Sequence, residues 1–256
     1  MRGWVIRGLR AVADLLLPRV CVVCGCKLEL EEQHICPDCL DDMPRTRFHM
    51  LEHNPMADRF NDAIQRHLED LWDACPTESH PLERYAYADA LFFYDNESDY
   101  RHIPQQIKYH DNIPAGRFFG QMLGEEIAAA GWSGSVDVVI PVPLHWRRRW
   151  TRGYNQAEII AAEVASVLGI PMRTDILKRT RHTRTQTRLD HSEKASNVRG
   201  AFAVSQCPDC SFGHVLLIDD VFTSGSTLMA CFVALREVFP PGVRISVATL
   251  GCVGQA

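Results

Sequence analysis

The chain has 256 residues, of which 46% are apolar and 23% charged, and its formal net charge is −5. This composition excludes disordered and collagen-like chains, because the apolar side chains suffice for a packed core. The longest unbroken apolar runs, such as residues 215–218, are much shorter than the roughly 20 residues of a membrane helix, so we expect no membrane span.

The charge is unevenly distributed along the chain. Residues 145–199 hold 12 Lys and Arg against 5 Asp and Glu, a local charge of +7, and the rest of the chain carries −12. A concentrated positive region predicts an anionic ligand, either phosphate groups or nucleic acid. A solvated surface explains the same count equally well, so charge alone does not decide.

The N-terminal region, residues 1–45, begins with an apolar stretch that charged residues interrupt. Arg7, Arg10 and Asp14 break the stretch, and no small-residue cleavage site follows it. These features favour an amphipathic lead-in helix over a signal peptide. Together with the cysteine pattern described next, they predict a soluble cytoplasmic protein.

Five of the ten cysteines lie within residues 21–39. Such clustering indicates a metal site in a reducing compartment rather than a secreted disulfide scaffold. Two Cys-x-x-Cys pairs have the spacing of a structural zinc ribbon, in which four thiolates hold one Zn²⁺ tetrahedrally. Cys26 and His34 are close enough in sequence to replace one ligand. The predicted zinc ligands are Cys21, Cys24, Cys36 and Cys39.

Residues 46–84 form an acidic, His-rich middle segment. Ile64, Leu68 and Leu71 recur there at helical spacing, which predicts one helix over about residues 63–72. We therefore expect residues 46–84 to be a helical connecting segment between the zinc ribbon and a third region, residues 85–256.

The third region alternates predicted strands with predicted helices. Residues 86–94 are typical of an edge strand or a hairpin arm, and the apolar residues between 118 and 130 repeat at helical spacing up to Gly131. Residues 136–140 predict a buried strand that ends at Pro141.

The next helix is expected to open at Asn155, with Glu158 three residues on as in a capping box. After it come a buried strand at residues 215–218, a helix reaching Val238 and a last strand at residues 245–250. Strands that alternate with helices predict an α/β fold, a parallel sheet flanked by helices on both faces. The predicted inner face of the helix after Asn155 is Ile160, Val164, Val167 and Leu168.

The segment VLLIDDVFTSGST, residues 215–227, is the most informative in the chain. Two carboxylates follow a buried strand at its carboxyl end, where open parallel sheets bind ligands. A loop of small hydroxyl residues then enters a helix, so backbone amides and hydroxyls converge on the positive end of the helix dipole. Gly225 permits the tight turn. A helix cap alone needs one such residue, so the segment favours a phosphate site.

This segment resembles the signature loop of type I phosphoribosyltransferases, which bind phosphoribosyl pyrophosphate (PRPP). The resemblance implies that Asp219 and Asp220 are the catalytic carboxylates, that they hold the ribose hydroxyls, and that they contact Mg²⁺ directly or indirectly. It further implies that the following loop holds the 5′-phosphate. The implied PRPP-binding residues are Asp219, Asp220, Val221, Phe222, Thr223, Ser224, Gly225, Ser226 and Thr227.

Two further stretches resemble the ComF family, in which a zinc ribbon precedes a phosphoribosyltransferase domain. They are IPVPLHWRRRWTRGYNQAEIIA, residues 140–161, and QQIKYHDN, which contains Lys108 and Tyr109. The residues QTRLDHSEKASNVRGAF continue the likeness. The resemblance covers about residues 1–45 and 85–252, whereas residues 61–84 have no counterpart that we can place.

The basic residues suggest how the pyrophosphate of PRPP would be held. The turn after the strand at residue 140 should line the pyrophosphate side, since departing pyrophosphate requires cations and amides. Residues 179–199 lack apolar periodicity and predict a mobile lid, with a disordered linker as the alternative. The expected pyrophosphate-side residues are Lys108, Pro143, Leu144, His145 and Arg149, and those of the lid are Arg181, Arg184 and Arg188.

Two functions follow from these patterns. One is a phosphoribosyltransferase that binds Mg-PRPP and transfers the phosphoribosyl group to an acceptor, linked by the ComF resemblance to competence and DNA uptake. The other is a non-catalytic PRPP- or nucleotide-binding module whose zinc ribbon and basic strip bind single-stranded nucleic acid or a DNA-uptake partner protein. The pair Cys207 and Cys210 stands apart, as a redox pair, half a metal site or an incidental loop.

Overall fold

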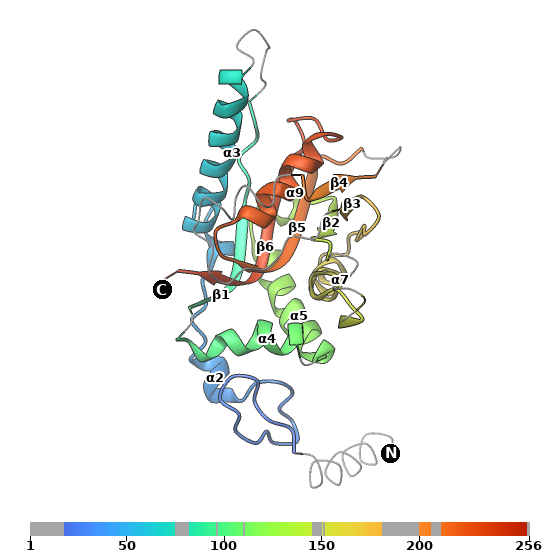
Figure 1. Cartoon of the computed structure of the whole chain (residues 1–256). Helices are drawn as coiled ribbons and strands as arrows, with labels where there is room; N and C mark the ends of the chain where they lie inside the picture. The colour runs from blue at the N-terminus through green and yellow to red at the C-terminus, as the bar shows by residue number, and fades with distance from the viewer. Residues whose placement is uncertain are drawn as a thin grey trace.

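The structure is a computed structural model that describes residues 18–74, 82–95, 97–109, 111–144, 150, 152–180, 200–205 and 211–254. One or more helices separate the strands β1, β2, β5 and β6 from one another along the chain (Figure 1). In chain order they are α2 (Pro37–Asp41), η1 (Phe48–Met50), α3 (Pro55–Ala74), β1 (Ala88–Tyr94), η2 (Asp99–Arg101), α4 (His102–Tyr109), α5 (Ile113–Ala129), η3 (Ser133–Ser135), β2 (Val138–Pro141), α7 (Gln156–Leu168), β3 (Leu177–Arg179), β4 (Phe202–Val204), β5 (His214–Phe222), α9 (Ser226–Arg236) and β6 (Arg244–Val253).

The main sheet has four parallel strands in the order β1-β6-β5-β2. In its register Ile140 pairs with Leu217, and Leu217 pairs with Val247. The predicted α/β fold is therefore confirmed. The hairpin alternative for residues 86–94 is wrong, because β1 is an edge strand that runs parallel to β6.

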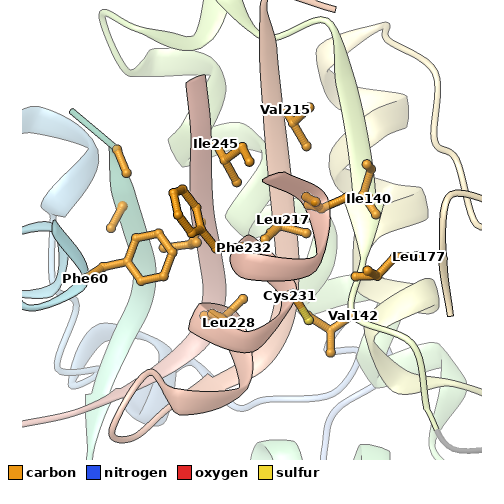
Figure 2. Close-up of a cluster of buried hydrophobic side chains, with 14 of the residues drawn as sticks. Phe60, Ile140, Val142, Leu177, Val215, Leu217, Leu228, Cys231, Phe232 and Ile245 are labelled. Atoms are coloured by element: carbon orange, nitrogen blue, oxygen red, sulfur yellow. The ribbon is translucent and has the colours of Figure 1, made fainter. Parts of the chain in front are cut away.

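Alternate residues of β5 enter the two core clusters on opposite faces of the sheet. Val215 and Leu217 pack with Phe232 of α9 (Figure 2), whereas Leu216 and Ile218 pack with the residues of α5 and α7. A strand that is apolar at consecutive positions is buried on both faces, which is why this strand reads as a continuous apolar run in the sequence.

Helices α5 and α7 pack against each other on one face of the sheet. Asn155 caps α7 by accepting a hydrogen bond from Ala157 N, as the sequence predicted. Two details of the predicted helices are wrong. Val167 is 36% exposed, so the inner face of α7 shifts toward Ala161 and Ala165, and Val238 lies beyond the end of α9 with 42% exposed.

Helix α3 is longer than the sequence pattern predicted, and it joins the core that covers the other face of the sheet. Met56, Phe60 and Ile64 are buried in the cluster that contains Phe232 of α9. The rings of Phe60 and Phe232 meet edge to face with centroids 6.1 Å apart, a favourable arrangement for an aromatic pair. The three-part division of the chain remains a prediction. Helix α3, however, packs beside the main sheet together with α9 (Figure 1).

The sequence pattern missed two features, the short helix α4 and the small antiparallel sheet of β3 and β4. Within the described ranges, none of the helices has the length and apolarity needed to cross a membrane. Cys231 and Cys252 are buried. The lead-in helix, Cys75, and the pair Cys207 and Cys210 fall outside the described residues.

Candidate functional site

A pocket of about 800 Å³ opens at the carboxyl ends of β2 and β5. This is the edge at which parallel sheets present ligand sites. Its wall combines both carboxylates near the carboxyl end of β5, the turn after β2, the end of α4, the start of α7 and the end of β3. The lining residues are Lys108, Tyr109, Asp111, Val142, Pro143, Leu144, Arg152, Asn155, Gln156, Arg179, Asp219, Asp220 and Thr227.

Asp219 and Asp220 form the acidic part of the pocket, and Lys108 from α4 faces them. Lys108 Nζ lies 2.6 Å from Asp220 Oδ2, and both side chains are largely buried. Burial by itself lowers the pKa of Lys108, but the two carboxylates more than offset this and raise it, so the ammonium stays charged. Burial and the neighbouring Asp220 charge raise the pKa of Asp219 to about 7.

The loop after Phe222 turns into α9 at Gly225, which has φ +75° and precedes the first helical residue. A Cβ at this position would lie 2.9 Å from Phe222 Cζ, so the position requires glycine. Ser224 Oγ donates a hydrogen bond to Ser226 Oγ at 3.0 Å. Thr227 at the start of α9 reaches the pocket wall.

Phe222 and Val221 differ from the other residues of the implied PRPP loop. Phe222 is 1% exposed and belongs to the core, so only its main chain is available to a ligand. Val221 is half-buried and pairs with Gly251 within the sheet. The binding roles of these residues, and of those between Thr223 and Ser226, remain predictions.

The motif RGYNQ builds the wall between α4 and α7. The guanidinium of Arg152 lies 4.8 Å from the centre of the Tyr109 ring and donates to Gln156 Oε1 at 3.2 Å. Tyr154 Oη donates to Ile107 O. Asn155 Nδ2 donates to Val142 O at 3.0 Å, so the residue that caps α7 also holds the turn after β2.

The structure adds two arginines that the sequence patterns did not assign to the site, although the first of them, Arg179, begins the segment 179–199 that is predicted to be a lid. Arg179, at the end of β3, lines the pocket and lies over the Phe202 ring. Arg59, on α3, donates to Thr223 O at 2.7 Å and its guanidinium lies 5.2 Å from the centre of the Phe222 ring. A helical pattern in α3 could not reveal this contact, because it joins residues far apart in the chain.

Pro143 and Leu144 lie on the pocket wall with Lys108, as expected for one side of the site. The remaining basic residues assigned to the pyrophosphate side and to the lid fall outside the described residues. They are His145, Arg149, Arg181, Arg184 and Arg188.

The cysteine cluster is formed by two loops that lie side by side. The Sγ atoms of Cys21, Cys24, Cys26 and Cys36 lie within 4.8 Å of one another, and Cys24 Sγ is 3.8 Å from Cys36 Sγ. Cys39 adjoins this group, since its thiol interacts with those of Cys36 and Cys24. Four clustered thiols suit tetrahedral Zn²⁺, so this cluster could hold such an ion.

The four clustered thiols therefore include Cys26, which the sequence offered only as an alternative ligand. Cys39, one of the four predicted ligands, lies farther from the other thiols. His34, the other alternative ligand, instead packs its ring 5.6 Å from that of Phe118 on α5. Hydrogen bonds from the Cys26 backbone and thiol lower the pKa of Cys24 to about 6, which favours a thiolate at this position.

Comparison with known families and proteins gives a consistent result. The phosphoribosyl transferase domain family matches residues 155–251. Competence protein F of Haemophilus influenzae is 38% identical over 103 residues, 40% of this chain and 45% of that protein. DNA utilization protein YhgH of Salmonella typhi is 30% identical over 129 residues, 49% of this chain and 56% of that protein. The matched segments span about half the length of these curated relatives.

Two solved structures also show similarity. Glutamine PRPP amidotransferase from B. subtilis, in complex with ADP and GMP, has a TM-score of 0.33 and 23% identity over 53% of this chain and 26% of its own. Orotate phosphoribosyltransferase from Aeropyrum pernix has a TM-score of 0.30 and 13% identity over 72% of this chain and 81% of its own.

Proposed function

We propose that this ComF-family protein, with its phosphoribosyl transferase domain, binds Mg-PRPP in the pocket at the carboxyl ends of β2 and β5. The observation that carries the proposal is the conjunction of Asp219, Asp220 and the loop that enters α9 at Gly225. The carboxylates can accept hydrogen bonds from ribose hydroxyls, and the adjacent loop can donate hydrogen bonds to a phosphate. A ribose 5-phosphate requires both kinds of group next to each other.

Asp219 and Asp220 would accept hydrogen bonds from the ribose hydroxyls. A carboxylate with raised pKa gains most from such donors, because they stabilise its charged form. The backbone amides at the start of α9, with the hydroxyls between Thr223 and Thr227, would bind the 5′-phosphate at the positive end of the helix dipole.

The residues present fit a divalent cation of the Mg²⁺ type. Asp219 and Asp220 offer only oxygen ligands, and Mg²⁺ binds through one or two carboxylates together with substrate phosphates. Mg²⁺ bound with PRPP would neutralise charge on the pyrophosphate. Lys108, 2.6 Å from Asp220, would hold the carboxylate in place and add positive charge beside the bond that breaks.

Transfer of the phosphoribosyl group is the catalytic form of this proposal. Pyrophosphate would leave the anomeric carbon as the acceptor approaches, and cations would stabilise the departing negative charge. Lys108, Arg152 and Arg179 are the cationic side chains that line the described pocket. The pocket needs only to position the reactants and supply charge, so no side chain is assigned as a general base.

Calorimetry with PRPP and Mg²⁺ tests the binding proposal. We expect the wild-type protein to bind PRPP only when Mg²⁺ is present. The double variant Asp219→Asn/Asp220→Asn should have an affinity for PRPP at least tenfold lower. Asp62→Asn, an exposed change on α3, serves as the matched control. Unchanged affinity in the double variant would refute the site. Pyrophosphate release with a panel of bases and amines then separates a transferase from a binding module.

The non-catalytic alternative draws its support from the relatives' names. These relatives are a competence protein and a DNA utilization protein, so a role of this chain with single-stranded DNA or a DNA-uptake partner protein is the second candidate. Here the zinc-binding cysteine cluster and the basic strip of residues 145–199 would bind the partner. A DNA affinity that falls steeply with salt is expected for this function. PRPP binding without pyrophosphate release would favour it.

A further inference from the structure

A second cluster of metal-type side chains lies away from the pocket, between the sheet and the segment that follows the cysteine cluster. It joins His49 of η1, Asp89 of β1 and Glu126 of α5. These residues come from three elements far apart in the sequence. Their ligand atoms lie within 4.8 Å of one another, and His49 Nδ1 is 3.5 Å from Glu126 Oε2.

Burial makes this cluster unusual. Asp89 is fully buried, with 0% exposed, in the second position of a strand that otherwise consists of apolar and aromatic residues. The side chains of His49 and Glu126 are 14% and 11% exposed. A buried charge costs several kcal/mol unless it is protonated, paired or bound to a metal, so a cation at this position would offset the burial of the two carboxylates.

Three polar atoms of the cluster have no hydrogen-bond partner among the described residues. Asp89 Oδ1 accepts from Ala90 N at 2.9 Å, and Arg45 Nη1 lies 2.7 Å from Glu126 Oε1. The remaining atoms are Asp89 Oδ2, Glu126 Oε2 and His49 Nδ1, and none of them has a hydrogen-bond partner of ordinary geometry among the described residues. Two of them, His49 Nδ1 and Glu126 Oε2, lie 3.5 Å apart, and Asp89 offers a carboxylate oxygen within 4.8 Å of the ligand atoms of both residues.

We propose that His49, Asp89 and Glu126 bind a divalent transition-metal ion, with Zn²⁺ as the best match. One imidazole nitrogen and two carboxylate oxygens are ordinary zinc ligands, and the 3.5 Å between His49 Nδ1 and Glu126 Oε2 is close to the about 3.4 Å expected between ligands of tetrahedral zinc. Water would take the fourth position on the partly exposed side. Mg²⁺ fits less well, because it prefers oxygen ligands throughout.

The charges around the cluster agree with a cation at its centre. Arg45 offsets one carboxylate, and within the described part of the chain no other lysine or arginine pairs with Asp89 or Glu126. The ion would connect β1, α5 and η1, and so fix the segment that leads from the cysteine cluster to the sheet. This site is separate from the cysteine cluster and from the proposed PRPP pocket.

Metal analysis of the full-length protein tests this site. After incubation with Zn²⁺ and desalting, we expect Asp89→Asn and Glu126→Gln each to hold about one zinc per chain fewer than the wild type. The cysteine-bound metal should remain in both variants, and an unchanged far-UV circular dichroism spectrum shows that the sheet domain is folded. Asp62→Asn on the surface of α3 is the control and should retain the full content. Equal zinc in wild type, Asp89→Asn and Glu126→Gln would overturn the proposal.

A second measurement needs no variant. Crystals of the zinc-incubated wild-type protein should give an anomalous-difference peak between Asp89 Oδ2 and His49 Nδ1 at the zinc edge. Absence of a peak there, with a peak at the cysteine cluster in the same crystal, would refute the site. An additional zinc that is lost in Asp219→Asn/Asp220→Asn, but not in Asp89→Asn, would likewise assign the ion to the pocket and refute the proposal.

Discussion

Two adjacent carboxylates at the end of β5 share one ammonium group. Lys108 lies 2.6 Å from Asp220, whereas Asp219 experiences the Asp220 charge more strongly than that of Lys108. The folded protein therefore holds one carboxylate whose ionisation is unfavourable. Titratable groups with a strongly shifted pKa are characteristic of functional sites, and Asp219 lies on the wall of the pocket.

Asp219→Asn should stabilise the ligand-free protein in a pH-dependent way. The pKa of Asp219 rises from an ordinary 3.8 to about 7 in the folded chain, so the unfolded chain loses this proton first as the pH rises. The resulting loss of stability is absent below pH about 4 and complete above pH about 7. Asparagine does not ionise.

We therefore expect the Tm of Asp219→Asn to match the wild type near pH 4 and to exceed it at pH 8 by at least about 3 °C, or about 1 kcal/mol in a chain of this size. Thermal melts across this pH range measure the difference, and Asp62→Asn should show no such trend. A Tm gain that stays constant with pH would contradict the raised pKa.

Gly225→Ala should both destabilise the protein and weaken PRPP binding. The position has φ +75°, and an added Cβ would lie 2.9 Å from the Phe222 ring. We expect a loss of ~1–3 kcal/mol in the free energy of unfolding and at least a tenfold loss in PRPP affinity, because the loop must shift. Gly131→Ala is the control, since a Cβ there meets nothing within 4 Å. Equal effects of the two changes in denaturant unfolding would contradict this explanation.

At the scale of elements, the pocket depends on how closely α5 approaches α7. Gly116, Gly120 and Gly124 are spaced by four residues and face α7. A Cβ at Gly120 would lie 3.1 Å from the Ile160 Cα atom, and one at Gly124 would lie 3.0 Å from Val167 Cβ. Because α7 begins at the pocket wall, this contact also sets the position of Asn155.

Gly120→Leu should separate the two helices. Its side chain would meet backbone atoms of Ile160 that cannot rotate away, so we expect a loss of about 3 kcal/mol in unfolding free energy, at the upper end of overpacking effects. Ala129→Leu, an exposed change on the same helix, should have little effect. Denaturant unfolding of both variants measures this, and a Gly120→Leu protein as stable as Ala129→Leu would rule out close packing here.

Helix α3 should support the phosphate loop through one side chain. Arg59 donates to Thr223 O at 2.7 Å and covers the Phe222 ring. We expect Arg59→Met to lower PRPP affinity several-fold with a small change in Tm, because the contact is exposed. Arg66→Met is the control, since Arg66 Nε donates a hydrogen bond to Asp62 O within the same helix. Equal PRPP affinity in Arg59→Met and wild type would refute this role.

At the scale of the molecule, the sequence was most informative where one local signal determines the structure. Periodicity located the parallel strands, and the Asp219–Asp220 pair with its glycine loop indicated the pocket. Contacts between distant segments were not predictable, because no local pattern encodes them. Examples are Arg59 on Thr223, Lys108 beside Asp220, and the joining of Asp89 with Glu126.

The cysteine cluster is attached to the sheet domain by polar contacts and by a shared apolar core. Tyr100 Oη donates to Cys39 O at 2.8 Å, His102 Nδ1 lies 3.2 Å from Val23 O, and His34 packs on Phe118. Val22, Val23 and Ile35 also belong to the buried apolar cluster that covers the α5 face of the sheet, whereas the cluster on the α9 face contains none of residues 18–45. Loss of metal from the cysteines should therefore loosen the N-terminal part and its packing on α4 and α5, and leave the core between the sheet and α9 in place.

Cys36→Ser should release the metal of the cysteine cluster, because Cys36 contributes to the four-thiol group and its Sγ lies 3.8 Å from that of Cys24. We expect the chain before residue 45 to become sensitive to protease while the sheet domain keeps its far-UV circular dichroism and its PRPP affinity. Cys252→Ser, a change of a buried cysteine outside the cluster, should retain the metal. Loss of the whole fold in Cys36→Ser would instead mean that the cluster and the sheet unfold as one cooperative unit.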